Sequence, residues 1–174
     1  LDMEVYGGQA KTPNLNQLAK EGLTFNRCFQ TAPMCSPTRH NIYTGLYPVR
    51  SGAWPNHTQV YPGTKSIVHY LGDSGYRVAL SGKGHISPRE SFPFEYSNDF
   101  SKNEPETRPF FPTLKKFIAQ CRSSETPFCL VACSNEPHSP YTMGDASAYP
   151  PESLKLPPSW VDTPATRASY SKYL

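Results

Sequence analysis

The sequence contains no long apolar run, no basic run and no CxxC cysteine pair. No stretch approaches the roughly 18 apolar residues of a membrane-spanning helix, so we expect no membrane span. The net charge of +3 comes without a basic cluster, which argues against nucleic acid as the main partner. The five cysteines form an odd set without a CxxC pair, which excludes the usual zinc spacing and disfavours a dense disulfide framework.

The first six residues also lack the basic head and apolar run of a signal peptide. The chain does have 174 residues, enough for one domain with a core of its own. Only 37% of the residues are hydrophobic and 19 are prolines, so we expect long loops between short elements.

The patterns along the chain predict strands that alternate with helices. Strands are expected over 23–29, 76–81 and 128–133, the last as a continuous apolar run buried on both faces. Helices are expected over 14–20, 37–44, 66–71 and 113–122, and from Pro164 onward. This order predicts an α/β fold with a mainly parallel sheet, in which functional sites form beyond the carboxyl ends of the strands.

One short segment combines a cysteine with a helix start: Cys35-Ser36-Pro37-Thr38-Arg39. Ser36 suits an N-cap, Pro37 suits the first helical position, and Gly45 suits the helix end. Cys35 would then lie at the positive end of a helix, where an anion is stabilised, and Arg39 could donate to the same anion. By itself Cys35 is equally consistent with a buried or redox thiol.

Two further segments carry polar groups just after predicted strands. Lys83 lies between two glycines with His85 two residues on, and His138 lies in a proline-rich loop after the last strand. Lys83 alone would be an ordinary surface lysine, and His138 could have only a surface role. Together with Cys35 and Arg39, these groups predict attack on an anionic tetrahedral centre by phosphoryl or sulfuryl transfer, and the residues alone do not separate the two.

The segment from Cys35 to Arg39, followed by Thr44-Gly45, resembles the signature of the formylglycine-dependent type I sulfatases. The family's opening helix resembles the segment from Thr12 to Gly22, its lysine–histidine motif resembles 82–85, and its later histidine motif resembles 137–140. The stretch 154–173 looks most like the heparan N-sulfatase (sulfamidase) and bacterial carbohydrate sulfatase branch. The resemblance implies an alkaline-phosphatase-like α/β sandwich.

The resemblance also implies the chemistry. In the family the cysteine is oxidised to formylglycine by a formylglycine-generating or sulfatase-maturating enzyme, and the aldehyde hydrate attacks the sulfur of a sulfated carbohydrate. By this resemblance Arg39 steadies the formylglycine, Lys83 binds the sulfate, His85 handles a hydroxyl proton, and His138 contacts the sulfate and protonates the leaving group. The implied product is sulfate released from an ester or a sulfamate, with a sulfated glycosaminoglycan as the leading substrate.

The family binds one calcium ion, and Cys35 is the only expected ligand in this sequence. We therefore expect residues 1–174 to be part of a sulfatase catalytic domain, without the N-terminal metal-binding strand and the C-terminal half, and to be inactive alone. The full-length protein is expected to be secreted or periplasmic, or lysosomal in a eukaryote. Two alternatives stay open: a phosphatase or phosphodiesterase of the same superfamily with Cys35 unmodified, and an inactive truncated homologue that binds glycans.

Overall fold

Two structural units make up the chain in the computed structural model, which describes residues 2–96, 111–134 and 136–174. One unit joins Leu1–Cys28 to Glu136–Leu174, and the other comprises Phe29–Asn135. No helix in the described ranges is both long and apolar enough to cross a membrane.

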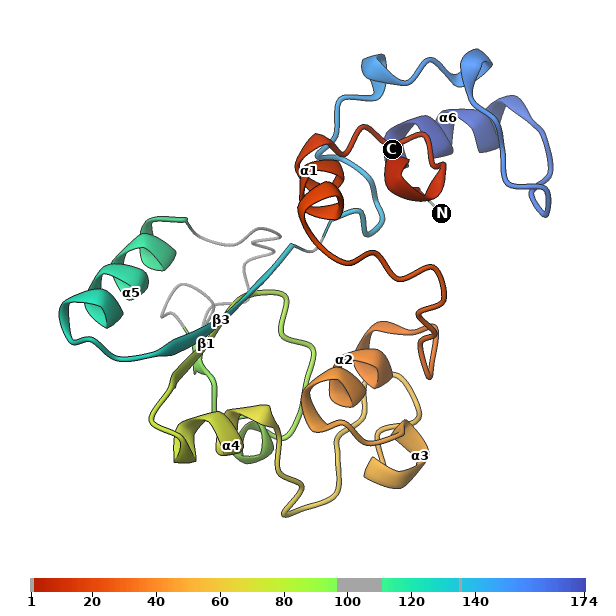
Figure 1. The fold of residues 1–174 in the computed structure, drawn as a ribbon. Helices are drawn as coiled ribbons and strands as arrows, with labels where there is room; N and C mark the ends of the chain where they lie inside the picture. The colour runs from red at the N-terminus through yellow and green to blue at the C-terminus, as the bar shows by residue number, and fades with distance from the viewer. Residues whose placement is uncertain (1, 97–110, 135) are drawn as a thin grey trace. The chain divides into compact units, whose positions relative to one another are not determined.

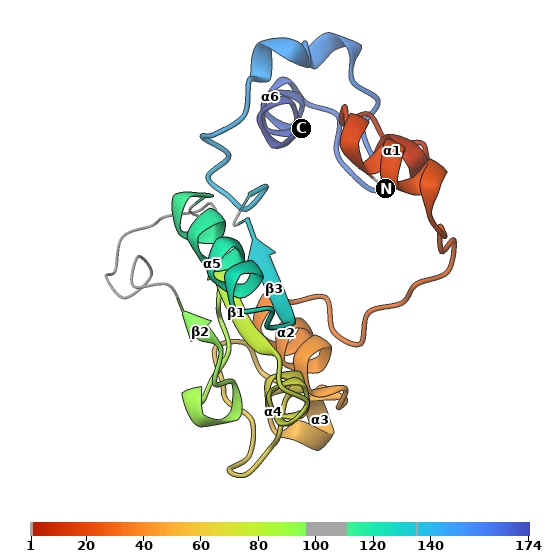
Figure 2. The same cartoon turned by 60° about the vertical axis from the view of Figure 1, so that its left-hand side comes forward.

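The unit Phe29–Asn135 is built on a parallel sheet of three strands in the order β2-β1-β3 (Figure 2). The central strand β1 (Arg77–Gly82) pairs with β2 (Glu95–Tyr96) on one side and with β3 (Phe128–Cys133) on the other. The register runs from Arg77 opposite Phe128 to Gly82 opposite Cys133. The predicted parallel sheet is confirmed.

Helices cover both faces of this sheet (Figures 1 and 2). They are α2 (Cys35–Thr44), α3 (Pro48–Ser51), α4 (Ile67–Asp73), η2 (Arg89–Ser91) and α5 (Phe111–Ser123). Val78 and Leu80 of β1 share one core cluster with Tyr43 of α2, whereas Ala79 packs with Phe117 of α5. Successive side chains of a strand point to opposite faces, so this alternation shows the predicted α/β layering.

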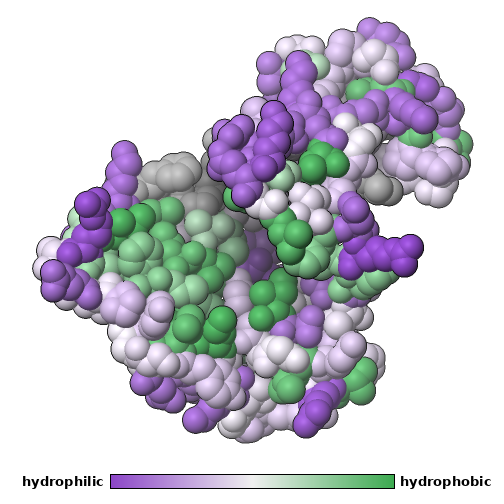
Figure 3. All heavy atoms as spheres, in the orientation of Figure 1, coloured by the Kyte–Doolittle hydropathy of each residue, from purple (hydrophilic) through white to green (hydrophobic). Residues whose placement is uncertain are grey.

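The strand β3 lies at the edge of this sheet and is only partly buried. Figure 3 shows apolar surface over β3 and the adjoining side of α5. The prediction that 128–133 is buried on both faces is therefore wrong, because the central position belongs to β1. Val131 and Leu130 still pack against the clusters on the two faces.

The other unit contains short helices with little core. They are η1 (Glu4–Tyr6), α1 (Pro13–Glu21), η4 (Ala146–Ala148), η5 (Pro151–Ser153) and α6 (Pro164–Tyr173). The side chain of Thr163 accepts from the N–H of Thr166 and so caps α6. The hydroxyl of Tyr173 donates to Asp2 at 2.8 Å, and burial together with this carboxylate raises the pKa of Tyr173 to about 12.

The strand predicted over 23–29 does not form. Leu23, Phe25 and Phe29 alternate as a strand would, yet their side chains are exposed. A strand exists only when its backbone groups are paired, and within the described ranges no other segment forms a ladder with this one. The remaining predicted strands and helices are confirmed to within two residues at each end, and α2 begins at Cys35, two residues before Pro37.

Candidate active site

The helix α2 begins with Cys35 itself. Met34 is the N-cap, and its carbonyl oxygen accepts from the N–H of Thr38 at 3.1 Å. Gly45 ends the helix in the left-handed conformation that favours glycine, as predicted. Cys35 therefore lies in the first turn, at the positive end of the helix. The prediction that Ser36 caps the helix is wrong, because the helix starts two residues earlier than predicted and Ser36 is buried against His40.

Asn56 lies beside the start of this helix. Its side-chain oxygen accepts from the N–H of Ser36 at 3.4 Å and lies 3.7 Å from the sulfur of Cys35. The first N–H groups of a helix have no partner within it, so Asn56 satisfies one of them. Sequence reasoning missed this residue, since Asn56-His57-Thr58 offered only a glycosylation sequon.

Arg39 joins α2 to the loop after β1. Its Nε donates to the main-chain oxygen of Gly84 at 2.6 Å, and Nη2 donates to the main-chain oxygen of Lys83. Nη2 also donates to the hydroxyl of Tyr43 at 3.0 Å and lies 3.2 Å from the sulfur of Cys133. Much of the guanidinium is therefore engaged in holding the loop that carries Lys83 and His85.

The buried His40 makes a second link between the same two segments. Nε2 lies 3.0 Å from the main-chain nitrogen and 3.0 Å from the main-chain oxygen of Ser87. Nδ1 donates to the main-chain oxygen of Ser36 at 2.8 Å, because a carbonyl oxygen only accepts. The ring of Phe92 packs edge-on against the imidazole of His40, with 5.3 Å between the two ring centroids. The sequence offered no sign of this role, because a buried histidine and an exposed one look alike there.

Lys83 and His85 follow β1, where the fold predicts a site. Lys83 shares an open pocket of about 350 Å³ with Cys35 and Arg39. Nε2 of His85 lies 2.9 Å from Nδ1 of His57. Burial lowers the pKa of His85, and His57, Lys83, Arg39 and His40 lower the pKa further. His57 is thus a second residue that sequence reasoning missed.

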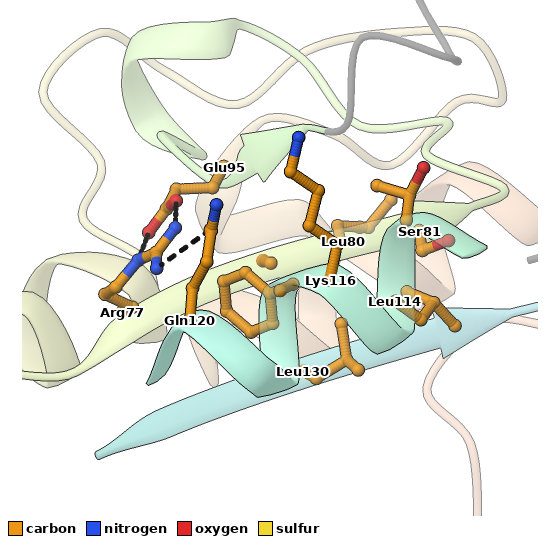
Figure 4. Close-up of a pocket in the computed structure, with 11 residues that line it drawn as sticks. Arg77, Leu80, Ser81, Glu95, Leu114, Lys116, Gln120 and Leu130 are labelled. Atoms are coloured by element: carbon orange, nitrogen blue, oxygen red, sulfur yellow. Dashed lines mark hydrogen bonds and ion pairs between the residues drawn. The ribbon is translucent and has the colours of Figure 1, made fainter. Parts of the chain in front are cut away.

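A separate pocket of about 300 Å³ lies between α5 and the sheet (Figure 4). Arg77 binds Glu95 there with an ion pair of 2.6 Å and stacks 4.8 Å from the ring centroid of Phe117. None of the predicted site residues lines it. Of the predicted site residues, Cys35, Arg39 and Lys83 line the other pocket instead.

His138 belongs to the other unit, in an exposed loop. Its Nδ1 lies 2.8 Å from the main-chain oxygen of Ser139 and must be the donor, since a carbonyl oxygen only accepts. The structure thus brings Cys35, Arg39, Lys83 and His85 into one unit. The role of His138 at sulfate stays a prediction.

Calcium takes about six to eight oxygen ligands. In the ranges that the structure describes, no group of three or more histidine, cysteine, aspartate or glutamate side chains could hold a metal ion. Cys35 has the oxygen of Asn56 beside it, which is far short of that number. The described residues do not fit a calcium ion by themselves.

The family model described as Sulfatase matches residues 1–159. The chain belongs to the sulfatase family. An ulvan-active sulfatase of Formosa agariphila is 30% identical over 141 residues, which cover 80% of this chain and 28% of the relative. Human N-sulphoglucosamine sulphohydrolase is 31% identical over 91 residues, which cover 49% of this chain and 18% of the relative. This sulfatase chain thus spans less than a third of either relative.

A solved structure of BT4656 in complex with its substrate, D-glucosamine-2-N,6-O-disulfate, superposes with a TM-score of 0.65. It is 22% identical, and the match covers 80% of this chain and 32% of that chain. This likeness concerns the fold and confirms the predicted alkaline-phosphatase-like α/β architecture. The two curated relatives fall in the branches that the sequence indicates, a sulfamidase and a carbohydrate sulfatase.

Proposed function

We propose that the full-length protein hydrolyses a sulfate ester or a sulfamate of a sulfated carbohydrate. The observation that carries this proposal is the placement of Cys35 in the first turn of α2, in one pocket with Arg39 and Lys83. Cationic side chains and a helix N-terminus favour an anion with tetrahedral oxygens. The relatives named above act on ulvan, on N-sulphoglucosamine and on a sulfated glucosamine, which supports a sulfated sugar.

The proposed nucleophile is formylglycine made from Cys35, and the cysteine sulfur stands where the aldehyde oxygen would be. Hydration of the aldehyde gives two hydroxyls on one carbon. One hydroxyl loses its proton, and its oxygen attacks the sulfur atom of the substrate's sulfate group. The bond from that sulfur to the sugar oxygen or nitrogen then breaks. The leaving atom takes a proton. The second hydroxyl then loses its proton, the carbonyl re-forms, and sulfate leaves with the electron pair of its bond to carbon.

The predicted site residues take distinct parts in this proposal. Lys83 neutralises charge on the sulfate oxygens, as a compact point charge can. His85, which the lowered pKa keeps neutral, accepts the hydroxyl proton. Arg39 holds the loop that carries both residues. His138 is proposed to protonate the leaving group.

The proposal extends to maturation and location. A formylglycine-generating or sulfatase-maturating enzyme would convert Cys35, and a calcium ion would take ligands in addition to those described here. The protein would act after export, as a secreted, periplasmic or lysosomal enzyme on extracellular glycans.

The test uses the full-length gene product, produced together with a maturating enzyme. N-sulfated glucosamine, 6-O-sulfated glucosamine and sulfated ulvan oligosaccharides are offered beside a phosphate monoester, and released sulfate and phosphate are measured. Release of sulfate that is abolished in C35A supports the proposal. Release of phosphate by a protein that retains the Cys35 thiol would establish the phosphatase alternative. Binding of a sulfated sugar without any release would establish the inactive glycan-binding alternative.

A further inference from the structure

Two histidines face each other in the unit that contains Cys35, and the mechanism above uses only one of them. Nε2 of His85 and Nδ1 of His57 lie 2.9 Å apart, and the ring centroids lie 4.6 Å apart at 43°. This distance is that of a hydrogen bond between two imidazoles. One ring must donate and the other must accept, because the gap holds a single proton.

The turn that carries His57 is tied to both sides of the site. Thr58 donates to the main-chain oxygen of Pro55 at 2.7 Å and closes the turn. Asn56 contacts the sulfur of Cys35, and the next residue, His57, contacts His85. The position of His57 is therefore fixed relative to the nucleophile as well as to His85.

Both histidines hold an uncommon backbone conformation. His57 has φ of 60° and His85 has φ of 51°, in the left-handed region that few residues other than glycine adopt. Non-glycine residues in such conformations gather at functional sites, where surrounding contacts maintain them. The imidazole pair is such a contact, since it joins the two strained residues.

The charges around the pair determine how many protons it holds. Lys83, on the same loop as His85, and Arg39, on α2, are cations near His85, and His40 of α2 also lies near enough to disfavour a charge on His85. An added positive charge on the pair is unfavourable beside two cations. The neutral pair has two N–H groups, of which one lies between the rings.

We propose that His57 is a positioning residue that accepts the hydrogen bond from Nε2–H of His85. This bond fixes the tautomer of His85 and leaves a lone pair on Nδ1, the form that can take a proton from the nucleophilic hydroxyl. When Nδ1 gains that proton, His57 stabilises the imidazolium through Nε2–H. An orienting group on the second nitrogen of a catalytic histidine is a general device of acid–base sites. The catalytic part of this inference rests on the proposed function.

The experiment compares three substitutions at position 57 in the full-length gene product. H57F keeps an aromatic ring and removes the accepting nitrogen. H57G removes the side chain, and H57N keeps a hydrogen-bond acceptor near the position of Nδ1. Glycine and asparagine both tolerate the positive φ at position 57. We expect H57F and H57G to lower kcat for sulfate release about 10- to 100-fold with little change in KM. H57N is expected to recover most of kcat.

A purely structural role for His57 gives a different result. All three variants would then unfold at lower temperature while kcat per folded molecule stayed at the wild-type value, and this outcome would overturn the proposal. Wild-type kcat in H57F would overturn it equally.

Nitrogen-15 NMR of the histidine rings tests the hydrogen bond without any substrate. We expect wild-type His85 to show one tautomer, protonated at Nε2, and H57F to show a mixture of both. A protein that releases no sulfate but shows this change would contradict the proposed function and support the positioning role. Unchanged His85 signals in H57F would overturn the positioning role even in an active sulfatase.

Discussion

The Nε group of Arg39 donates a 2.6 Å hydrogen bond to the main-chain oxygen of Gly84. The helix that begins with Cys35 and the loop that ends with His85 are therefore held together by a side chain from the signature motif. His40, the next residue of the helix, makes a second link through Ser87. Arg39 thus acts mainly by holding the loop that carries Lys83 and His85 against the helix that carries Cys35.

Replacing Arg39 by lysine removes the planar set of donors while keeping the charge. We expect R39K to lower kcat about 100-fold, because small displacements of catalytic groups have effects of that size. We also expect a loss of roughly 1–3 kcal/mol in the free energy of unfolding, since main-chain oxygens lose their partners. Sulfate release and urea unfolding measure the two effects.

Arg167 offers a matched control in the other unit. Its Nη1 donates to the main-chain oxygens of Pro151 and Leu154 at 3.0 and 2.8 Å, so it also joins segments through carbonyl groups. R167K should lower the melting temperature and leave kcat per folded molecule unchanged. Equal loss of kcat in R39K and R167K would contradict a specific role for Arg39.

Replacing the buried His40 tests the second link. H40L leaves the N–H of Ser87 without its partner and removes a bond to Ser36, so we expect a loss of about 2–3 kcal/mol in the free energy of unfolding. The half-buried His69, which completes the capping box of α4, is the control, and H69L should cost roughly 1 kcal/mol. The urea concentration at the unfolding midpoint measures both losses, provided that the dependence of the unfolding free energy on urea concentration stays the same. A smaller effect at His40 than at His69 would refute the assigned contacts.

Two glycines allow a paired test of the backbone. Gly82 has φ of 88°, and a Cβ there would overlap the main-chain oxygen of Cys133, so we expect G82A to cost about 2–4 kcal/mol. Gly72 lies in α4, where an added Cβ would meet no atom within 4 Å, so G72A should stabilise by about 0.5–1 kcal/mol. Thermal unfolding of both variants gives the comparison, and a neutral G82A would show that the β1–β3 edge is looser than described.

The lowered pKa of His85 predicts a pH dependence. The ordinary value is 6.5, so below that pH the unfolded chain takes up the proton more readily than the folded protein does. The contribution of His85 to stability is full above about pH 6.5 and is lost as the pH falls toward the folded-state pKa. An NMR titration of His85 should give a midpoint below 6.5, and H85Q should remove this part of the pH dependence. A midpoint above 6.5 would contradict the environment described for the ring.

Most elements of the fold could be predicted because their signals are local. Pro13 at a helix start, Gly45 at a helix end and the apolar run of β3 all depend on neighbouring residues. The strand over 23–29 failed because pairing depends on a partner far away in the sequence. The short strand β2 was missed because two residues carry no periodicity.

The site could be predicted only where the residues belong to a motif. Cys35, Arg39, Lys83 and His85 were found in this way, and the structure places all four in one unit. Asn56 and His57 were not found, because tertiary contacts across more than 20 residues of chain create their roles. His40 was missed for the same reason.

The mass of the tryptic peptide 28–39 from active full-length protein tests the proposed nucleophile itself. This peptide contains Cys35 and also the exposed Cys28, which serves as an internal control for alkylation. Conversion of Cys35 to formylglycine predicts a mass lower by about 18 Da and a single alkylated cysteine. An active preparation in which both cysteines are alkylated and no mass is lost would contradict a formylglycine nucleophile at position 35.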